Sequence, residues 1–156
     1  MAGLNLVVEP GRQEIIGTWE FDAPRDLVFK AFTDPKAIPQ WWGPRGLTTT
    51  VDKMDVRKGG MWRFVQRDES GEYAFNGVYH LVTPERMVYT FEWEGLPGHI
   101  LLETVTLEER GGRTIMTDQS VFQSVADRDG MVANGMEEGG RQTMERFAEL
   151  LERLRK

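Results

Sequence analysis

The chain has 156 residues, 40% hydrophobic and 28% charged, so we expect one globular domain over residues 1–156. Its 19 basic and 25 acidic residues give a net charge of −6. This balance argues against a nucleic-acid partner, because phosphate binding depends on clustered Lys and Arg. The sequence has no cysteine, which excludes disulfides, thiolate zinc sites and cysteine nucleophiles.

Targeting signals are not expected. No apolar run approaches the roughly 20 residues that span a bilayer, so membrane insertion is not predicted. The first residues lack the basic region and the long apolar stretch of a signal peptide. We therefore expect a cytoplasmic protein.

The first predicted elements are a strand and two short helices. Residues 13–21 alternate between the two faces of a half-buried strand. Pro24 suits a helix start, where its missing N–H costs nothing, and this helix ends at Asp34-Pro35. A second helical turn carries Trp42 and stops at Gly43-Pro44.

A period of two then predicts a run of strands. We expect them at about 47–56, 60–67, 72–83, 86–94, 99–109 and 112–123. The connectors are short and rich in turn residues, and such links cannot hold a parallel crossover. The prediction is an antiparallel meander of six strands, with the strand at 13–21 joining at an edge.

Beyond Ser124 the period becomes 3.6, which predicts one amphipathic helix of about 25 residues. Its inward stripe is expected to hold Val132, Met136, Gly140, Thr143, Phe147, Leu150, Leu151 and Leu154. The curved sheet is the only large apolar face available to it. The predicted fold is therefore α+β: a curved antiparallel sheet of six to seven strands wrapped around a long C-terminal helix.

Several motifs carry a resemblance to a known family. They are Ala23-Pro24, Phe32-Thr33-Asp34-Pro35, Trp41-Trp42-Gly43-Pro44, Asp55-Val56-Arg57-Lys58-Gly59-Gly60, Gly77-Val78-Tyr79, Pro84-Glu85-Arg86-Met87-Val88-Tyr89-Thr90, Gly112-Arg113-Thr114 and Met136-Glu137-Glu138-Gly139. Over residues 13–155 the chain resembles the helix-grip (START-like, SRPBCC) superfamily. Within it, the chain is similar to bacterial homologues of the C-terminal domain of the heat-shock protein 90 ATPase activator. The resemblance implies a helix-grip fold with a cavity for small apolar molecules, and no particular reaction.

Large aromatic side chains are the first candidates for a ligand site. Most such rings fill a core, but some can enclose a flat or lipid-like ligand. The rings we expect at the ligand are Trp42, Trp62, Phe75, Tyr79 and Trp93, with Trp42 at the rim.

The Gly139-Gly140 pair is unusual because each mid-helix glycine costs about 1 kcal/mol relative to alanine. For Gly139 we expect close packing of the helix on the sheet, or a kink. Gly140 stands where the family motif implies a tryptophan. Either the cavity is enlarged there, bordered by Gly140 and Met136, or Met136 and Met144 fill the space.

Glu103 and His99 are the polar candidates. Glu103 shares its strand face with Leu101 and Val105, so its pKa should be raised unless a cation pairs with it. That is the profile of a general acid or base; the alternative is a glutamate that reaches solvent or an arginine. His99 follows Pro97-Gly98 and lies either at the cavity mouth or in solvent.

Other chemistry is not indicated. Two histidines and no cysteine leave no metal-ligand spacing, so we expect neither a metal nor a cofactor. No Gly-x-Ser-x-Gly elbow is present, and we assign no catalytic residue.

Three functions compete. The leading hypothesis is binding of a small apolar or aromatic molecule in the cavity. The second is an enzyme of the cyclase or hydrolase type that uses Glu103 or His99 in the same cavity. The third, and least favoured, is a chaperone ATPase co-regulator, because the related eukaryotic activator has an additional N-terminal domain that we do not expect here.

Overall fold

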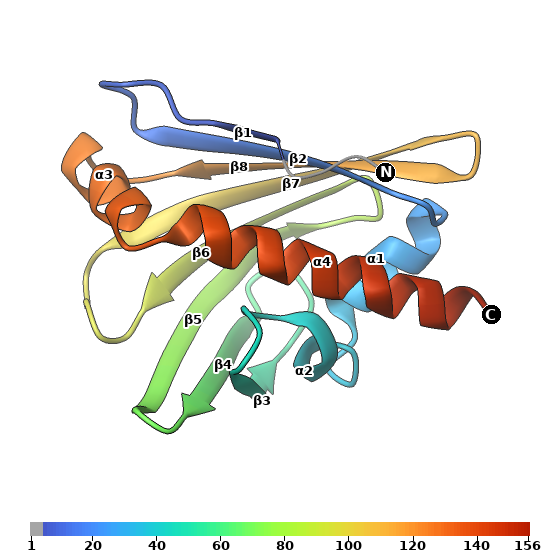
Figure 1. Cartoon of the computed structure of the whole chain (residues 1–156), viewed down its shortest axis with the longest axis horizontal. Coiled ribbons are helices and arrows are strands. Elements are labelled where there is room, and N and C mark those ends of the chain that lie inside the picture. The colour runs from blue at the N-terminus through green and yellow to red at the C-terminus, as the bar shows by residue number, and fades with distance from the viewer. Residues whose placement is uncertain (1–4) are drawn as a thin grey trace.

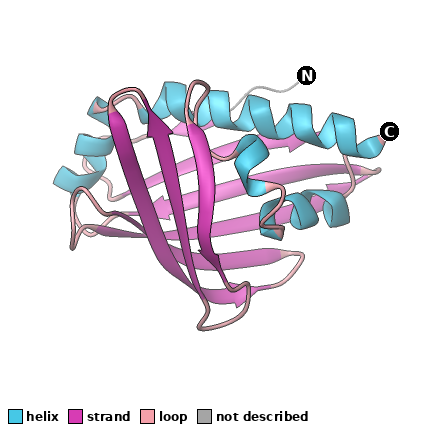
Figure 2. Ribbon diagram, turned by 90° about the horizontal axis from the view of Figure 1, so that it is seen from below, coloured by secondary structure: helices cyan, strands magenta, loops and turns pink. Residues whose placement is uncertain are grey.

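An antiparallel sheet and four helices make up residues 5–156, the part of the chain that the computed structural model describes (Figure 1). The elements, in chain order, are β1 (Asn5–Val7), β2 (Glu14–Phe21), α1 (Arg25–Thr33), α2 (Ile38–Trp41), β3 (Thr48–Met54), β4 (Met61–Asp68), β5 (Gly71–Val82), β6 (Arg86–Trp93), β7 (Ile100–Arg110), β8 (Arg113–Val121), α3 (Val125–Ala133) and α4 (Met136–Arg155). The sheet curls, and α4 lies across its concave side (Figure 2).

The sheet has eight strands in the order β1-β2-β8-β7-β6-β5-β4-β3. The prediction of six to seven strands is therefore wrong, because it omitted the short strand β1. This strand pairs with β2 and places Leu6 opposite Gly17. The strand β2 was expected at an edge of the sheet, but it lies between β1 and β8. A strand of three residues, Asn5-Leu6-Val7, is too short for a period of two to be recognised.

Turn chemistry explains why the meander was predictable. The bounds of β3 to β8 agree with the predicted strands to within two residues. Between β7 and β8, Gly111 and Gly112 have φ of 57° and 79°. Positive φ at both central residues is the requirement of a type I′ hairpin turn, which matches the twist of the flanking strands.

The C-terminal segment forms two helices and not the single helix expected there. Helix α3 begins after Ser124, whose hydroxyl accepts a hydrogen bond from the Asp127 N–H at 3.0 Å. It ends at Ala133 with Asn134 as the C-cap, and Gly135 then adopts φ of 83°, with which an α-helix cannot continue. Helix α4 then runs for 20 residues.

The two halves of α4 have different surroundings. In the C-terminal half, Phe147 is fully buried, with its ring centroid 5.0 Å from that of Phe21 and 4.4 Å from that of Trp41. Leu154, the last residue of the expected stripe, is 47% exposed and does not belong to the core. The N-terminal half instead faces a cavity, lined there by Met136, Gly140, Thr143 and Met144.

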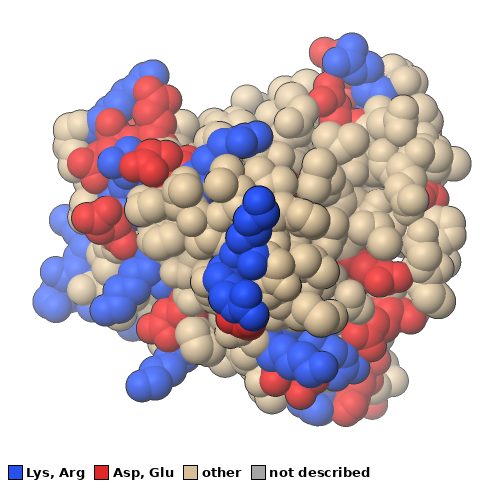
Figure 3. All heavy atoms as spheres, turned by 180° about the vertical axis from the view of Figure 1, so that it is seen from behind, with Lys and Arg blue, Asp and Glu red and all other residues tan. Residues whose placement is uncertain are grey.

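The side of the molecule away from α4 carries acidic and basic side chains close together (Figure 3). Among the ion pairs of the described residues, Arg63 contacts Asp52 at 3.1 Å and Glu94 at 2.8 Å. Within residues 5–156, no helix combines the length and apolar character needed to cross a membrane.

Candidate functional site

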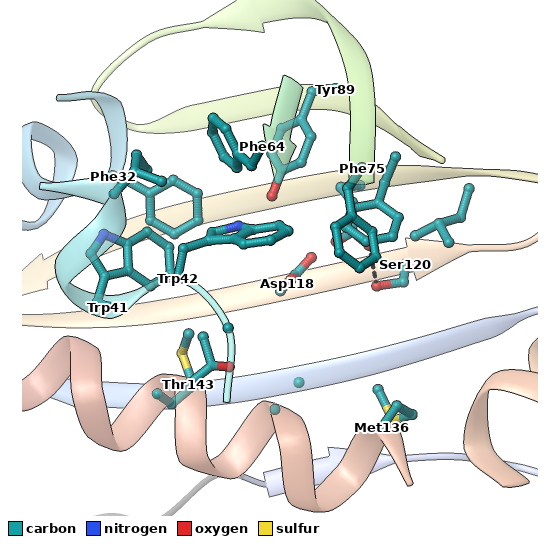
Figure 4. Close-up of a pocket in the computed structure, with 18 of the residues that line it drawn as sticks. Phe32, Trp41, Trp42, Phe64, Phe75, Tyr89, Asp118, Ser120, Met136 and Thr143 are labelled. Carbon is teal, nitrogen blue, oxygen red and sulfur yellow. Dashed lines mark hydrogen bonds between the residues drawn. The ribbon is translucent and has the colours of Figure 1, made fainter. Parts of the chain in front are cut away.

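A cavity of about 340 Å³ lies between the concave side of the sheet and α4. Aromatic rings form much of its wall (Figure 4). They are Phe32, Trp41, Trp42, Trp62, Phe64, Phe75, Tyr79, Tyr89 and Phe91. The rings come from α1, α2 and three neighbouring strands of the sheet, β4, β5 and β6, so the cavity depends on the whole fold.

The adjacent tryptophans at the end of α2 have different environments. Trp41 belongs to the core, where its indole N–H donates a hydrogen bond to the Ala31 carbonyl at 3.0 Å. Trp42 is the C-cap of α2, with extended backbone, and its ring points into the cavity (Figure 4). Its centroid lies 5.0 Å from that of Phe64 and 5.3 Å from that of Phe75.

A pair of carboxyl groups interrupts this apolar wall. Glu103 on β7 is only 7% exposed and accepts a hydrogen bond from the Ser120 hydroxyl at 2.8 Å. The register of β7 and β8 places Glu103 opposite Ser120 and Val105 opposite Asp118, so Asp118 and Ser120 share one face (Figure 4). Burial raises the pKa of Glu103 well above 4.5, and so do the charge of Asp118 and a hydrogen bond to it.

Asp118 is the less satisfied member of the pair. Its Oδ1 is buried and has no hydrogen-bond partner among residues 5–156. Burial raises the pKa of Asp118 also, while the contact with Glu103 opposes that rise. The arrangement therefore favours one proton held mainly by Glu103 and one negative charge centred on Asp118.

Tyr89 on β6 faces the same carboxyl pair from the opposite side of Glu103 in the sheet. Burial, followed by the negative charges of Asp118 and Glu103, raises the pKa of its phenol well above the ordinary value of 10.0. Tyr89 therefore stays protonated and adds a polar but uncharged group to the cavity.

Seven of the nine predicted site residues line the cavity. They are Trp42, Trp62, Phe75, Tyr79, Glu103, Met136 and Gly140. Trp93 lies outside it, exposed, with its indole over the backbone of Gly95. His99 is also outside: its Nδ1 lies 2.9 Å from the Asp127 carboxylate, and its side chain is 47% exposed.

Two interpretations change with this geometry. Glu103 reaches neither solvent nor an arginine. Of the two interpretations given above, the desolvated carboxyl is therefore the one that fits. A Cβ placed on Gly139 would meet nothing within 4 Å, so close helix–sheet packing at Gly139 is wrong. Glycine is therefore not required there by a neighbouring atom.

Sequence reasoning identified Glu103 but missed its two polar neighbours in the cavity wall, Asp118 and Ser120. The signal was present: both share the parity of Met116, which the alternation of residues 112–123 turns inward. The Gly111-Gly112 turn then pairs Arg110 with Arg113, and counting back along the hairpin brings Ser120 opposite Glu103.

The described residues contain no group of three or more His, Cys, Asp or Glu side chains placed to hold a metal ion. The polar groups that line the cavity are the carboxyls of Glu103 and Asp118, the hydroxyls of Ser120 and Thr143, the phenols of Tyr79 and Tyr89, and the amide of Gln66.

The order of elements, with a C-terminal helix on the concave side of an antiparallel sheet, defines the helix-grip fold of the START-like (SRPBCC) superfamily. Residues 22–152 match the family described as activator of Hsp90 ATPase homolog 1-like protein. The match spans most of the chain, which therefore belongs to this family.

Solved structures agree with this fold. A protein of Chromobacterium violaceum is 26% identical, with a TM-score of 0.80 over 90% of this chain and 97% of its own. A protein of Arthrobacter aurescens is 24% identical, with a TM-score of 0.88 over 96% and 91% of the two chains. DynU16, from the dynemicin biosynthetic locus, is 20% identical, with a TM-score of 0.67 over 90% of this chain and 47% of its own. No curated protein matches the sequence.

Proposed function

We propose that the chain binds a small apolar or aromatic molecule in the cavity between α4 and the sheet. The observation that carries the proposal is the aromatic wall around about 340 Å³ of space. Ligand pockets in proteins measure roughly 300–1,000 Å³ and are lined mainly by apolar and aromatic side chains. The family also suggests a ligand-binding fold.

The shape of the wall favours a flat ligand. Trp42 contacts Phe75 and Phe91 at centroid distances of 5.3 and 6.4 Å, so its ring belongs to a cluster that presents extended aromatic surface. Offset or edge-to-face contacts with such rings stabilise an aromatic guest by about 0.5–1.5 kcal/mol each, beyond the burial of its area.

The test is a thermal-shift screen of fatty acids, isoprenoids and aromatic metabolites. We expect aromatic compounds to raise the melting temperature and to change the fluorescence of Trp42 and Trp62, both of which line the cavity. Absence of any stabilising compound across the three classes would count against ligand binding.

A pair of neighbouring glycines offers a matched control. Gly140 borders the cavity, and Gly140→Trp should fill it and remove the response to a ligand found in the screen. Gly139 does not line the cavity, so Gly139→Ala should leave the response intact. Retention of full ligand affinity in Gly140→Trp would show that the ligand binds elsewhere.

An enzyme acting in the same cavity is the second candidate, favoured by Glu103. A buried carboxyl with a raised pKa can donate a proton at neutral pH, and Asp118 beside it can accept one. His99 takes no part in this candidate because it lies outside the cavity. Mass spectrometry of ligands incubated with the chain tests it: product formation that Glu103→Gln abolishes without loss of binding would establish catalysis.

The family description also raises a chaperone-related role. We expect no stimulation of a heat-shock protein 90 ATPase, because the proposed site is enclosed between the sheet and α4. A saturable, several-fold rise in ATP turnover would instead favour the chaperone role.

A further inference from the structure

The carboxyl pair leaves an unused hydrogen-bond acceptor in the cavity wall. Asp118 Oδ1 is buried and accepts no hydrogen bond from an N–H or hydroxyl group of the described residues, whereas Glu103 Oε1 already accepts from the Ser120 hydroxyl at 2.8 Å. The proton on Glu103 can serve only one of the two Asp118 oxygens, so the carboxylate keeps an acceptor that a donor on a ligand would satisfy.

The charge of the pair is also uncompensated. Tyr89 faces it from β6, with Tyr79 opposite Tyr89 on β5, and both keep their protons because burial raises their pKa values. The other described elements contribute only uncharged side chains to the cavity wall. No Lys, Arg or His among residues 5–156 lines the cavity. A carboxylate in such surroundings lacks a cation.

A second buried polar atom in the same wall is unpaired. Gln66 on β4 is 4% exposed, lines the cavity, and its Nε2 has no hydrogen-bond partner within the described part of the chain. Buried polar groups are nearly always hydrogen-bonded, so an orphan amide and an orphan carboxylate oxygen in the wall of one cavity indicate a ligand with polar atoms of its own.

We propose that the ligand is an amine: a protonated amino group on a flat apolar body, bound with its ammonium at Asp118. This inference rests on the proposed function and names its ligand class. The ammonium supplies the missing donor as a charge-assisted hydrogen bond. It also supplies the missing positive charge, and the faces of Trp42, Trp62 and Tyr89 provide the electron-rich surface that attracts cations.

Calorimetric titration with three matched probes tests the inference: naphthylethylamine, naphthylethanol and naphthylacetic acid. We expect the amine to bind at least about tenfold tighter than the alcohol, and the acid to bind most weakly. Equal affinity for amine and alcohol, or tighter binding of the acid, would overturn the amine assignment and leave ligand binding standing. If none of the three probes binds and the wider screen also yields no ligand, both proposals fail.

Variants locate the effect. Asp118→Asn keeps the shape and removes the charge, so the amine should lose its advantage while the alcohol still binds. Asp52→Asn makes the same chemical change outside the cavity, at a carboxylate that is 46% exposed on β3, and should keep the advantage as the matched control. In Glu103→Gln the amide N–H can still donate a hydrogen bond to Asp118, so this variant should also bind the amine more tightly than the alcohol. An undiminished amine preference in Asp118→Asn would refute the assignment.

The pH dependence gives an independent reading in the unmodified chain. An alkyl amine stays protonated below about pH 9, as lysine does, so only the carboxyl pair titrates. Both carboxyls have raised pKa values, so lowering the pH adds a second proton to the pair, and the amine preference should decline while alcohol affinity stays constant. In Glu103→Gln, where Asp118 has no second carboxyl beside it, the decline should occur at lower pH. A pH-independent preference would contradict the assignment.

Discussion

At the scale of single residues, the buried pair of Glu103 and Asp118 determines how stability depends on pH. The pKa of each carboxyl lies above its ordinary value, raised first of all by burial. The folded state therefore binds protons more tightly than the unfolded state does. The contribution of these two carboxyls to the free energy of unfolding is largest below about pH 4.5 and is lost as the pH rises through the elevated pKa values.

Glu103→Gln should therefore stabilise the free protein at pH 8 by roughly 1–3 kcal/mol, because it removes a buried ionisable group and keeps the acceptor for Ser120. The gain should vanish as the pH falls well below the ordinary pKa of 4.5, where the carboxyl is protonated in both the folded and the unfolded state. Melting temperatures across this range measure it. Glu108→Gln, on the exposed face of the same strand, is the control; a larger gain at low pH would have the wrong sign.

A site residue was predictable where the alternation of its own strand was enough to place it on the inner face. Trp62 and Glu103 follow from alternation within their own strands. Asp118 is less evident, because on its own strand the neighbouring Thr117, Gln119 and Ser120 are polar as well. Its significance comes from the hairpin register, which brings it beside Glu103, and from the absence of a hydrogen-bond partner in the folded wall.

At the scale of elements, α4 contains a glycine that its surroundings do not require. A Cβ at Gly139 meets nothing within 4 Å, so Gly139→Ala should raise stability by about 0.5–1 kcal/mol through helix propensity. Gly135→Ala, at φ of 83° between α3 and α4, should instead lower it by about 1–2 kcal/mol. Urea unfolding of both variants measures the contrast. Destabilisation by Gly139→Ala would show that the helix needs flexibility there.

The elements that sequence reasoning predicted are those whose ends carry turn chemistry. The meander was predictable because Gly, Pro and Asp separate its strands. The division between α3 and α4 was not, because Asn134-Gly135 interrupts a helical stripe that continues on both sides. Strand β1 was missed because its edge position in the sheet depends on β2, not on any pattern of its own.

At the scale of the whole molecule, Phe147 joins α4 to the sheet and to both early helices. Its ring centroid lies within 5.8 Å of those of Phe21, Phe32 and Trp41. Phe147→Ala should cost about 3–5 kcal/mol, the range for a fully buried phenylalanine. Leu154→Ala, at an exposed position of the same helix, should change stability by less than about 0.5 kcal/mol. Denaturant unfolding checks both, and a mild effect at Phe147 would mean that α4 is held elsewhere.

The pairing of β2 with β8 has a kinetic consequence. Residues 22–112 separate the two strands, so closing this loop costs roughly 3 kcal/mol more in chain entropy than closing a hairpin. During synthesis β2 emerges among the first elements but must wait for β8, while β3 to β7 can pair with their neighbours at once. In that interval β2 has only the short strand β1 beside it. Its other edge is unpaired and Ile15, Trp19 and Phe21 are uncovered, the state in which a nascent chain is most exposed to aggregation.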